Sequence, residues 1–281
     1  MKKLLTLLLP LLCLLMLTPA SAQLDVQLTP VRHDFITGEG AALNITITNH
    51  TDTTLQLNNT PGRPWLNVLV FRNGQEAPIA PIANAKYPAL TLSPGSRRAF
   101  RLNLKDSYRL DTTGNYKAVA TIRMPNNTET YSSNRAGFAM VPGGDFRTFQ
   151  VQARGRKLDM SVRLAQMDGY SNLFGQVTDR ETHRAVGACF MARYLNFMKP
   201  IVKLDAAQNL HILCQSSPDI YTYAVMNTHG ERTHYQLYKR TAGPIDLVGG
   251  GKGGMTPVGL TPFVPAKGDK PQYNNASDRP F

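Results

Sequence analysis

Apolar and polar residues alternate along residues 90–124, and this alternation predicts two β-strands. In the first, Phe100, Leu102 and Leu104 alternate with arginine, asparagine and lysine, so one face is apolar and the other is polar. In the second, alternate positions of residues 116–122 form another apolar face. A strand pair with one apolar face needs a second sheet to cover it. The pattern therefore predicts a β-sandwich.

The same alternation recurs in short segments from residue 24 to residue 140, for example at Leu43, Ile45 and Ile47. Residues 68–71, followed by Asn73-Gly74, predict a hairpin with a type I′ turn. We expect about seven or eight strands here, which is the pattern of an immunoglobulin-like sandwich. The sequence therefore predicts an all-β fold that begins with an Ig-like β-sandwich over residues 23–142.

A second, smaller β-domain is expected over residues 143–242. The segment Val141-Pro142-Gly143-Gly144 suits a short joint between domains, and alternating segments resume after it. We expect a small sandwich or a meander. Glycine and proline dominate residues 243–281, and their apolar residues are isolated. Such a segment buries too little surface to offset its ordering entropy, so we predict a disordered C-terminal tail.

Three segments of the first domain resemble a bacterial Ig-like module: ALNITITNHTDTTLQL, LTLSPGSRRAFRLNL and YRLDTTGNYKAVATI. The same order of features occurs in intracellular proteinase inhibitors of the BsuPI type and in the β-rich N-terminal portion of deuterolysin-like metalloproteases. The resemblance covers residues 41–123 and implies the sandwich fold. It does not extend to the metalloprotease chemistry, because the chain has no His-Glu-x-x-His motif.

Residues 1–22 predict a secretory signal peptide. Two lysines precede an apolar run over residues 4–17, and Ala20-Ser21-Ala22 matches the small-x-small cleavage pattern. A membrane anchor is the alternative, but the run is shorter than the roughly 20 apolar residues that a span needs. We therefore expect an exported protein, periplasmic or secreted, whose mature chain starts at Gln23 and has no transmembrane segment.

The charge is basic along the whole chain. The formal net charge is +12, and it falls to +10 without Lys2 and Lys3. A diffuse excess of this kind suits contact with anionic polymers such as envelope polysaccharide, but it is more typical of a solvated basic surface. Nucleic acid is not an expected partner for an exported protein.

Cys189 and Cys214 are the two cysteines of the predicted mature chain. In an oxidising compartment a disulfide between them would close a loop of about 25 residues and contribute roughly 3 kcal/mol. Two buried free thiols are the alternative, and the sequence leaves both open. We expect no metal site at His211 and Cys214, because residues three apart on a strand point to opposite faces. No cofactor is predicted.

Two features are candidates for a ligand surface. Tyr221 and Tyr223 share one face of a predicted strand, which suits sugar stacking and aromatic packing across strands equally well. Arg154, Arg156 and Lys157 belong to a basic turn that suits an anionic ligand.

No catalytic residue is assigned. The sequence has no Gly-x-Ser-x-Gly motif, and the glycine-rich run over residues 249–254 lacks the order of a phosphate loop. The sequence therefore predicts an exported, non-catalytic binding or structural protein of the bacterial envelope or extracellular space, with an envelope protein or an anionic polysaccharide as its partner. The alternative is an inhibitor or accessory module of a secreted protease, and a hydrolase with dispersed catalytic residues is a third class.

Overall fold

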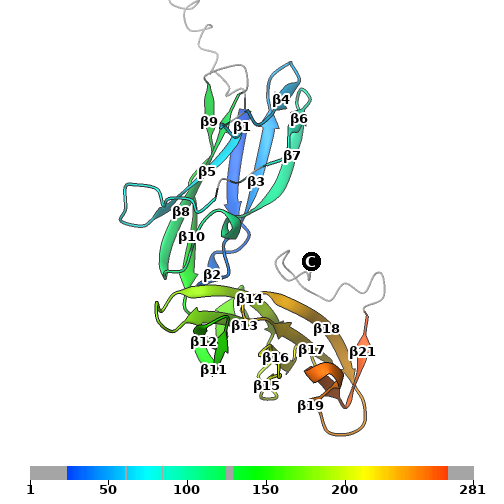
Figure 1. Ribbon diagram of the computed structural model, residues 1–281. Helices are drawn as coiled ribbons and strands as arrows, with labels where there is room; N and C mark the ends of the chain where they lie inside the picture. The colour runs from blue at the N-terminus through cyan, green and yellow to red at the C-terminus, as the bar shows by residue number, and fades with distance from the viewer. Residues whose placement is uncertain (1–23, 61, 84, 86, 125–128, 265–281) are drawn as a thin grey trace, which may run out of the picture.

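The structure, a computed structural model, describes residues 24–60, 62–83, 85, 87–124 and 129–264. The predicted signal peptide, residues 1–22, lies outside the described residues. Nearly every regular element is a β-strand, and the only helical elements among the described residues are two short 3₁₀ turns, η1 (Leu104–Asp106) and η2 (Gly251–Gly253) (Figure 1). The all-β prediction is confirmed.

The residues before Pro142 form a sandwich of two antiparallel sheets with one parallel pairing. One sheet has the order β1 (Leu24–Pro30), β3 (Ala42–Asn49), β7 (Arg97–Asn103). The other has the order β2 (Asp34–Ile36), β10 (Ala136–Val141), β8 (Gly114–Arg123), β5 (Leu66–Arg72), with β9 (Thr130–Ser132) on β8. A separate pair joins β4 (Leu55–Leu57) to β6 (Leu90–Leu92). The parallel pair is β2 with β10.

The predicted inward faces fill the core of this sandwich. Leu43, Ile45 and Ile47 on β3 have no exposed surface, and alternate residues of β8 from Tyr116 to Ile122 are buried against them. The two strands predicted from residues 90–124 do form, as β7 and β8. They are not partners, however, because β7 pairs with β3 and β8 pairs with β5 and β10.

The hairpin predicted at Asn73-Gly74 is wrong. The chain does turn there, with Gly74 at φ 81° and a bond from the Gln75 amide to the Arg72 carbonyl, but β5 pairs with β8 instead of with the residues that follow. The following segment contains Pro78 and Pro81, and prolines cannot donate to a strand ladder. It therefore continues as a loop.

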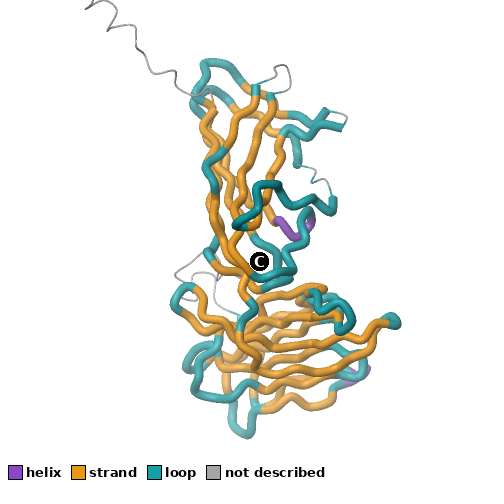
Figure 2. The backbone as a smooth tube through the Cα atoms, turned by 90° about the vertical axis from the view of Figure 1, so that its left-hand side faces the viewer, coloured by secondary structure: helices purple, strands orange, loops and turns teal. Residues whose placement is uncertain are grey.

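The residues after Gly143 form two more sheets. The first has the order β11 (Gly144–Ala153), β12 (Arg156–Met167), β13 (Tyr170–Asp179), β14 (Ala185–Arg193). The second has the order β15 (Ile201–Leu204), β16 (Leu210–Gln215), β17 (Ile220–Met226), β18 (Arg232–Arg240), β21 (Leu260–Phe263). Within each sheet consecutive strands pair antiparallel, and one apolar cluster lies between the two sheets. Figure 2 shows the strands of this domain lying across the direction of those in the first.

The predicted tail starts too early. Residues 246–263 contain β19 (Asp246–Gly249), β20 (Met255–Val258) and β21. β19 pairs with β20, and β21 extends the second sheet by pairing with β18. The part of the predicted tail over residues 265–281 lies outside the described residues. The second domain therefore extends about 20 residues beyond its expected end at residue 242.

Candidate functional site

The two domains meet through an apolar cluster at the end of β2. Ile36 has no exposed surface and packs with Phe174 of the second domain. The Arg32 guanidinium lies 4.5 Å from the ring centroid of Phe35 and 5.6 Å from that of Phe174, and it pairs with Glu39. A cation held against aromatic rings of both domains adds a directional contact to the apolar burial.

Backbone groups just after Ile36 bind the second domain directly. The Gln176 side-chain amide donates to the Thr37 carbonyl at 2.8 Å. The Ala188 amide donates to the Gly38 carbonyl at 3.0 Å. Gly38 has φ 87°, and a Cβ on it would lie 2.7 Å from the Ala185 Cβ, so this position requires glycine for both its conformation and its space.

Strand β14 also crosses the turn between β17 and β18 at two glycines. A Cβ on Gly187 would lie 2.3 Å from the His229 carbonyl oxygen, and a Cβ on Gly230 would lie 2.4 Å from the Gly187 carbonyl carbon. The two backbones therefore touch with no side chain between them. Together with the bonds at Gly38, this contact holds three segments in fixed positions around the joint.

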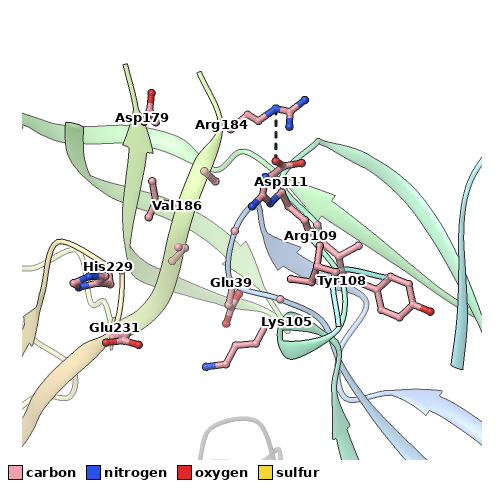
Figure 3. Close-up of a pocket in the computed structure, with 18 of the residues that line it drawn as sticks. Glu39, Lys105, Tyr108, Arg109, Asp111, Asp179, Arg184, Val186, His229 and Glu231 are labelled. Carbon is pink, nitrogen blue, oxygen red and sulfur yellow. Dashed lines mark ion pairs between the residues drawn. The ribbon is translucent and has the colours of Figure 1, made fainter. Parts of the chain in front are cut away.

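A cleft of about 520 Å³ opens beside the joint (Figure 3). Its walls come mainly from the β2–β3 loop, η1 and the segment after it, the start of β12, the end of β13, the start of β14 and the β17–β18 turn, so both domains contribute. Its charged lining residues are Glu39, Lys105, Asp106, Arg109, Asp111, Arg156, Asp179, Arg184 and Glu231. Four cations against five carboxylates make the cleft mixed in charge and close to neutral.

Some of these charges are already paired. Hydrogen bonds from the Thr182 backbone amide and from the Arg156 side chain lower the pKa of Asp179 to about 2, so this carboxylate stays ionised. Arg184 Nε lies 3.9 Å from Asp111 Oδ2, and this ion pair joins the two domains across the cleft (Figure 3). Because that oxygen is buried and has no hydrogen-bond partner within the described residues, the pairing is incomplete.

Three other charged residues of the cleft form no ion pair within the described residues. These residues, Lys105, Arg109 and Glu231, are all exposed. The Glu231 carboxylate accepts a hydrogen bond from the Asn227 side-chain amide at 2.9 Å, within its own turn. Figure 3 places Arg109 beside Asp111 and Arg184, and Glu231 beside His229 on a different wall. The cleft therefore offers charged groups of both signs to a ligand without breaking the contacts that hold the domains together.

The predicted tyrosine surface is wrong. Tyr221 is 3% exposed and Tyr223 is 5% exposed. They share a face as expected, but that face packs against Leu247 of β19, in the segment that was expected to be a disordered tail. The β19–β20 pair covers the sheet, so neither ring is available for sugar stacking.

Tyr223 instead belongs to a buried polar network. Its hydroxyl donates to the Met255 carbonyl at 2.9 Å and lies 2.7 Å from Nδ1 of His211, whose Nε2 lies 2.9 Å from an Asp205 oxygen. Burial raises the pKa of Tyr223 to about 12. Burial alone would raise the pKa of Asp205, but hydrogen bonds from Asn209 and His211 outweigh it and hold that pKa below its ordinary value. The network ties β16 and β17 to β20, which gives it a structural role.

The predicted basic turn is exposed. Arg154, Arg156 and Lys157 all lie on the surface, and Arg154 and Gly155 form a two-residue hairpin turn with φ 53° and 75°. Arg156 is bound to Asp179, so it reaches into the cleft wall. Arg154 and Lys157 are exposed to solvent, and neither forms an ion pair with another described residue.

Both cysteines are free thiols, so the structure contains no Cys189–Cys214 disulfide. The Cys189 thiol contacts the Met191 sulfur at 3.5 Å, and the Cys214 thiol donates to the Arg193 carbonyl. Cys214 lies in the core between the sheets, whereas His211 faces Tyr223, so the two point to opposite faces as predicted. Among the described residues no group of three or more His, Cys, Asp or Glu side chains could hold a metal ion.

Sequence reasoning missed the cleft. Its residues come from positions 38 to 231, and each looks like an ordinary surface residue in its own segment. The one local sign is Thr37-Gly38-Glu39-Gly40, where two glycines with positive φ flank a carboxylate before a strand. That pattern marks an unusual turn but does not identify what lies opposite it.

Comparisons with family models and with curated proteins found no match. Among solved structures, the sporulation control protein Spo0M from Bacillus subtilis is similar at 8% sequence identity and a TM-score of 0.32, with 73% of this chain and 79% of that chain covered. This likeness is too low to support an argument about function. In the part of the chain that the structure describes, no helix is long and apolar enough to cross a membrane.

Proposed function

We propose that this protein is an exported, non-catalytic binding protein of the bacterial envelope, built on an Ig-like sandwich, and that its interdomain cleft holds a mixed-charge segment of a partner protein. The cleft is the observation that carries the proposal. Ligand sites occur preferentially at domain interfaces, and this one is shaped by backbone contacts that leave the surrounding segments little freedom. Export rests on the signal pattern of residues 1–22.

The charge of the cleft favours protein over polysaccharide as the ligand. An anionic polymer needs a run of cations, but here cations and carboxylates are nearly equal in number. Arg109 and Glu231 offer opposite charges from different walls. A peptide segment that carries both an acidic and a basic side chain matches this arrangement, and pairing of this kind sets orientation more than affinity.

Site-specific photocrosslinking tests the proposal. A photoreactive phenylalanine analogue replaces Val186, which is 36% exposed and lines the cleft. The matched control replaces Phe197, which is 80% exposed and follows the far end of β14, an end that lies about 23 Å from Val186 by strand length. In envelope extract, we expect a protein adduct from position 186 that disappears in the Arg109→Glu, Glu231→Arg variant and is absent from position 197. Equal adducts at both positions, or retention of polysaccharide alone, would contradict the proposal.

A second candidate, an inhibitor of a secreted protease, is favoured by the loop after β5. Ile82 in this loop is 59% exposed, and the loop is held by bonds from the Ile79 amide to the Val70 carbonyl and from the Ile82 amide to the Ser107 carbonyl. An exposed loop that is fixed at its base can occupy a protease site at low entropic cost. Stoichiometric slowing of a secreted protease, lost in Ile82→Asp, would support it. Absence of slowing across a panel of secreted proteases would exclude it for that panel.

A further inference from the structure

Strand β11 forms the outer edge of its sheet, at the opposite side from β14 (Figure 1). It has ten residues, and most of its positions are exposed. An edge strand exposes backbone groups that can pair with another chain, so proteins usually protect such edges.

The turn at Arg154-Gly155 fixes which backbone groups face outward. A two-residue turn with positive φ at both positions makes the flanking pair, Ala153 and Arg156, a hydrogen-bonded pair. Bonded pairs then recur at every second residue of the ladder. The amides and carbonyls of the intervening residues Thr148, Gln150 and Gln152 therefore point away from β12. None of these backbone groups has a hydrogen bond to another described residue.

Two other edge strands, β1 and β14, have such cover. On β1, the Asn134 side chain accepts from the Leu28 amide at 2.8 Å and donates to the Leu28 carbonyl at 2.9 Å. On β14, the Ala188 amide donates a hydrogen bond to the Gly38 carbonyl, and the Arg232 side chain donates one to the Phe190 carbonyl at 3.1 Å. The middle of β11 has no such cover within the described residues.

The second half of this edge, from Thr148 to Gln152, also lacks charged side chains. Thr148, Gln150 and Gln152 are exposed and uncharged, whereas Phe149 and Val151 face the core. There is no proline or lysine in β11. Two charged residues lie in the first half of the strand: Asp145, whose side chain is 72% exposed and pairs with Arg163, and Arg147, whose guanidinium lies 4.8 Å from the ring centroid of Phe149. The basic turn follows just after the end.

We propose that β11 pairs antiparallel with β11 of a second copy of this chain, across a two-fold axis at Gln150. In this register Gln150 faces its own equivalent, and Thr148 faces Gln152 of the second copy. All three outward-facing residues then form bonded pairs, and the two four-stranded sheets become one continuous sheet. The same register sets Arg147 opposite Ala153 of the second copy and brings Asp145, which lies beyond a register shift in the ladder, near the basic turn around Gly155 of that copy. Each end of the interface therefore brings one acidic and one basic side chain to that turn.

Cysteine cross-linking tests both the pairing and its register. In the purified protein, Gln150→Cys is expected to form a disulfide-linked dimer on mild oxidation with copper phenanthroline, because paired Cα atoms lie about 5.5 Å apart. The matched control, Thr148→Cys, is expected to stay unlinked, since the two equivalent residues are offset by about 13 Å along the strands. The double variant with Thr148→Cys and Gln152→Cys is expected to link again. The native cysteines do not interfere, because burial raises the pKa of both thiols to about 12.

Sedimentation of the unmodified protein provides the second measurement. We expect a species of twice the chain mass that is lost in Gln150→Lys, where two ammonium groups would face each other, and weakened in Asp145→Lys. Gln150→Pro removes only an outward amide, so it should also be monomeric while its thermal unfolding stays near that of the wild type. A monomer at every concentration, or equal cross-linking through residues 148 and 150, would overturn the proposal. Cross-linking to a different protein in extract would assign the edge to that partner instead.

Discussion

Replacing Gly187 by alanine should loosen the joint that shapes the cleft. The added Cβ would lie 2.3 Å from the His229 carbonyl oxygen and 3.4 Å from the Gly230 Cα. Carbon and oxygen cannot approach to 2.3 Å without bonding, so β14 or the β17–β18 turn must move by about 1 Å. Because these atoms belong to the backbone, no side chain can rotate to relieve the contact. Gly187 does not have positive φ, so the effect comes from the clash and not from backbone strain.

The expected cost follows from the same contact. Overpacking of this kind destabilises a folded protein by about 1–3 kcal/mol. Alanine also lowers the conformational entropy of the unfolded chain, which stabilises the folded state by about 0.4–1 kcal/mol and offsets part of this cost. The net loss should therefore be roughly 1–2 kcal/mol, measured as a lower urea midpoint with an unchanged slope. The Val186 photocrosslink should weaken in the same variant, because the cleft wall has moved.

Gly137→Ala is the matched control. Gly137 also lies in a strand, β10, and a Cβ there would meet no atom within 4 Å. This change should leave stability unchanged or raise it slightly. If Gly187→Ala proves as stable as Gly137→Ala, the close approach of β14 to the turn is not present in the protein. The joint would then not hold the cleft in a preformed shape.

Three further results are expected. Tyr223→Phe leaves a ring nitrogen of the buried His211 without its partner and should cost about 1–3 kcal/mol in urea unfolding; an unchanged midpoint would remove the network's structural role. Asp179 has its pKa lowered from 3.8 to about 2, so its charge stabilises the fold above about pH 4. The stability difference between wild type and Asp179→Asn should therefore shrink as the pH falls from 4 to 2, and a constant difference would contradict this. Cys189 and Cys214 should both be unreactive toward Ellman's reagent until the protein is unfolded, after which both should react; a native protein that yields no thiols even when unfolded would show a disulfide.

Strands such as β3 and β8 of the first domain could be predicted because one face is exposed to solvent and the other is buried. Apolar residues alternate at Leu43, Ile45 and Ile47 because successive side chains of a strand point to opposite faces. Alternation identifies the face of a strand but not its neighbour. The consecutive strands β7 and β8 therefore looked like partners, although they lie in opposite sheets.

The C-terminal strands could not be predicted from composition. Composition predicts disorder only for a segment that must supply its own buried surface, whereas β21 pairs with the edge of a sheet that already exists. In β19 a single residue, Leu247, is 1% exposed and covers the tyrosine face. Short segments of this kind need few apolar residues, because the rest of the domain provides the template. The error at the tail and the error at Tyr221 and Tyr223 therefore have one cause.

The cleft and the β11 edge place the two proposed interactions on different parts of the second domain. β14, which lines the cleft, and β11 are the two outer strands of one four-stranded sheet, so they lie about 14 Å apart across it. A dimer through β11 would leave both clefts open and would hold two of them on one continuous sheet. A partner with two matching segments would then bind with higher avidity than either cleft provides alone. Because Gln150→Lys changes only the edge and Arg109→Glu with Glu231→Arg changes only the cleft, binding measured in each variant separates the affinity of one site from the gain due to pairing.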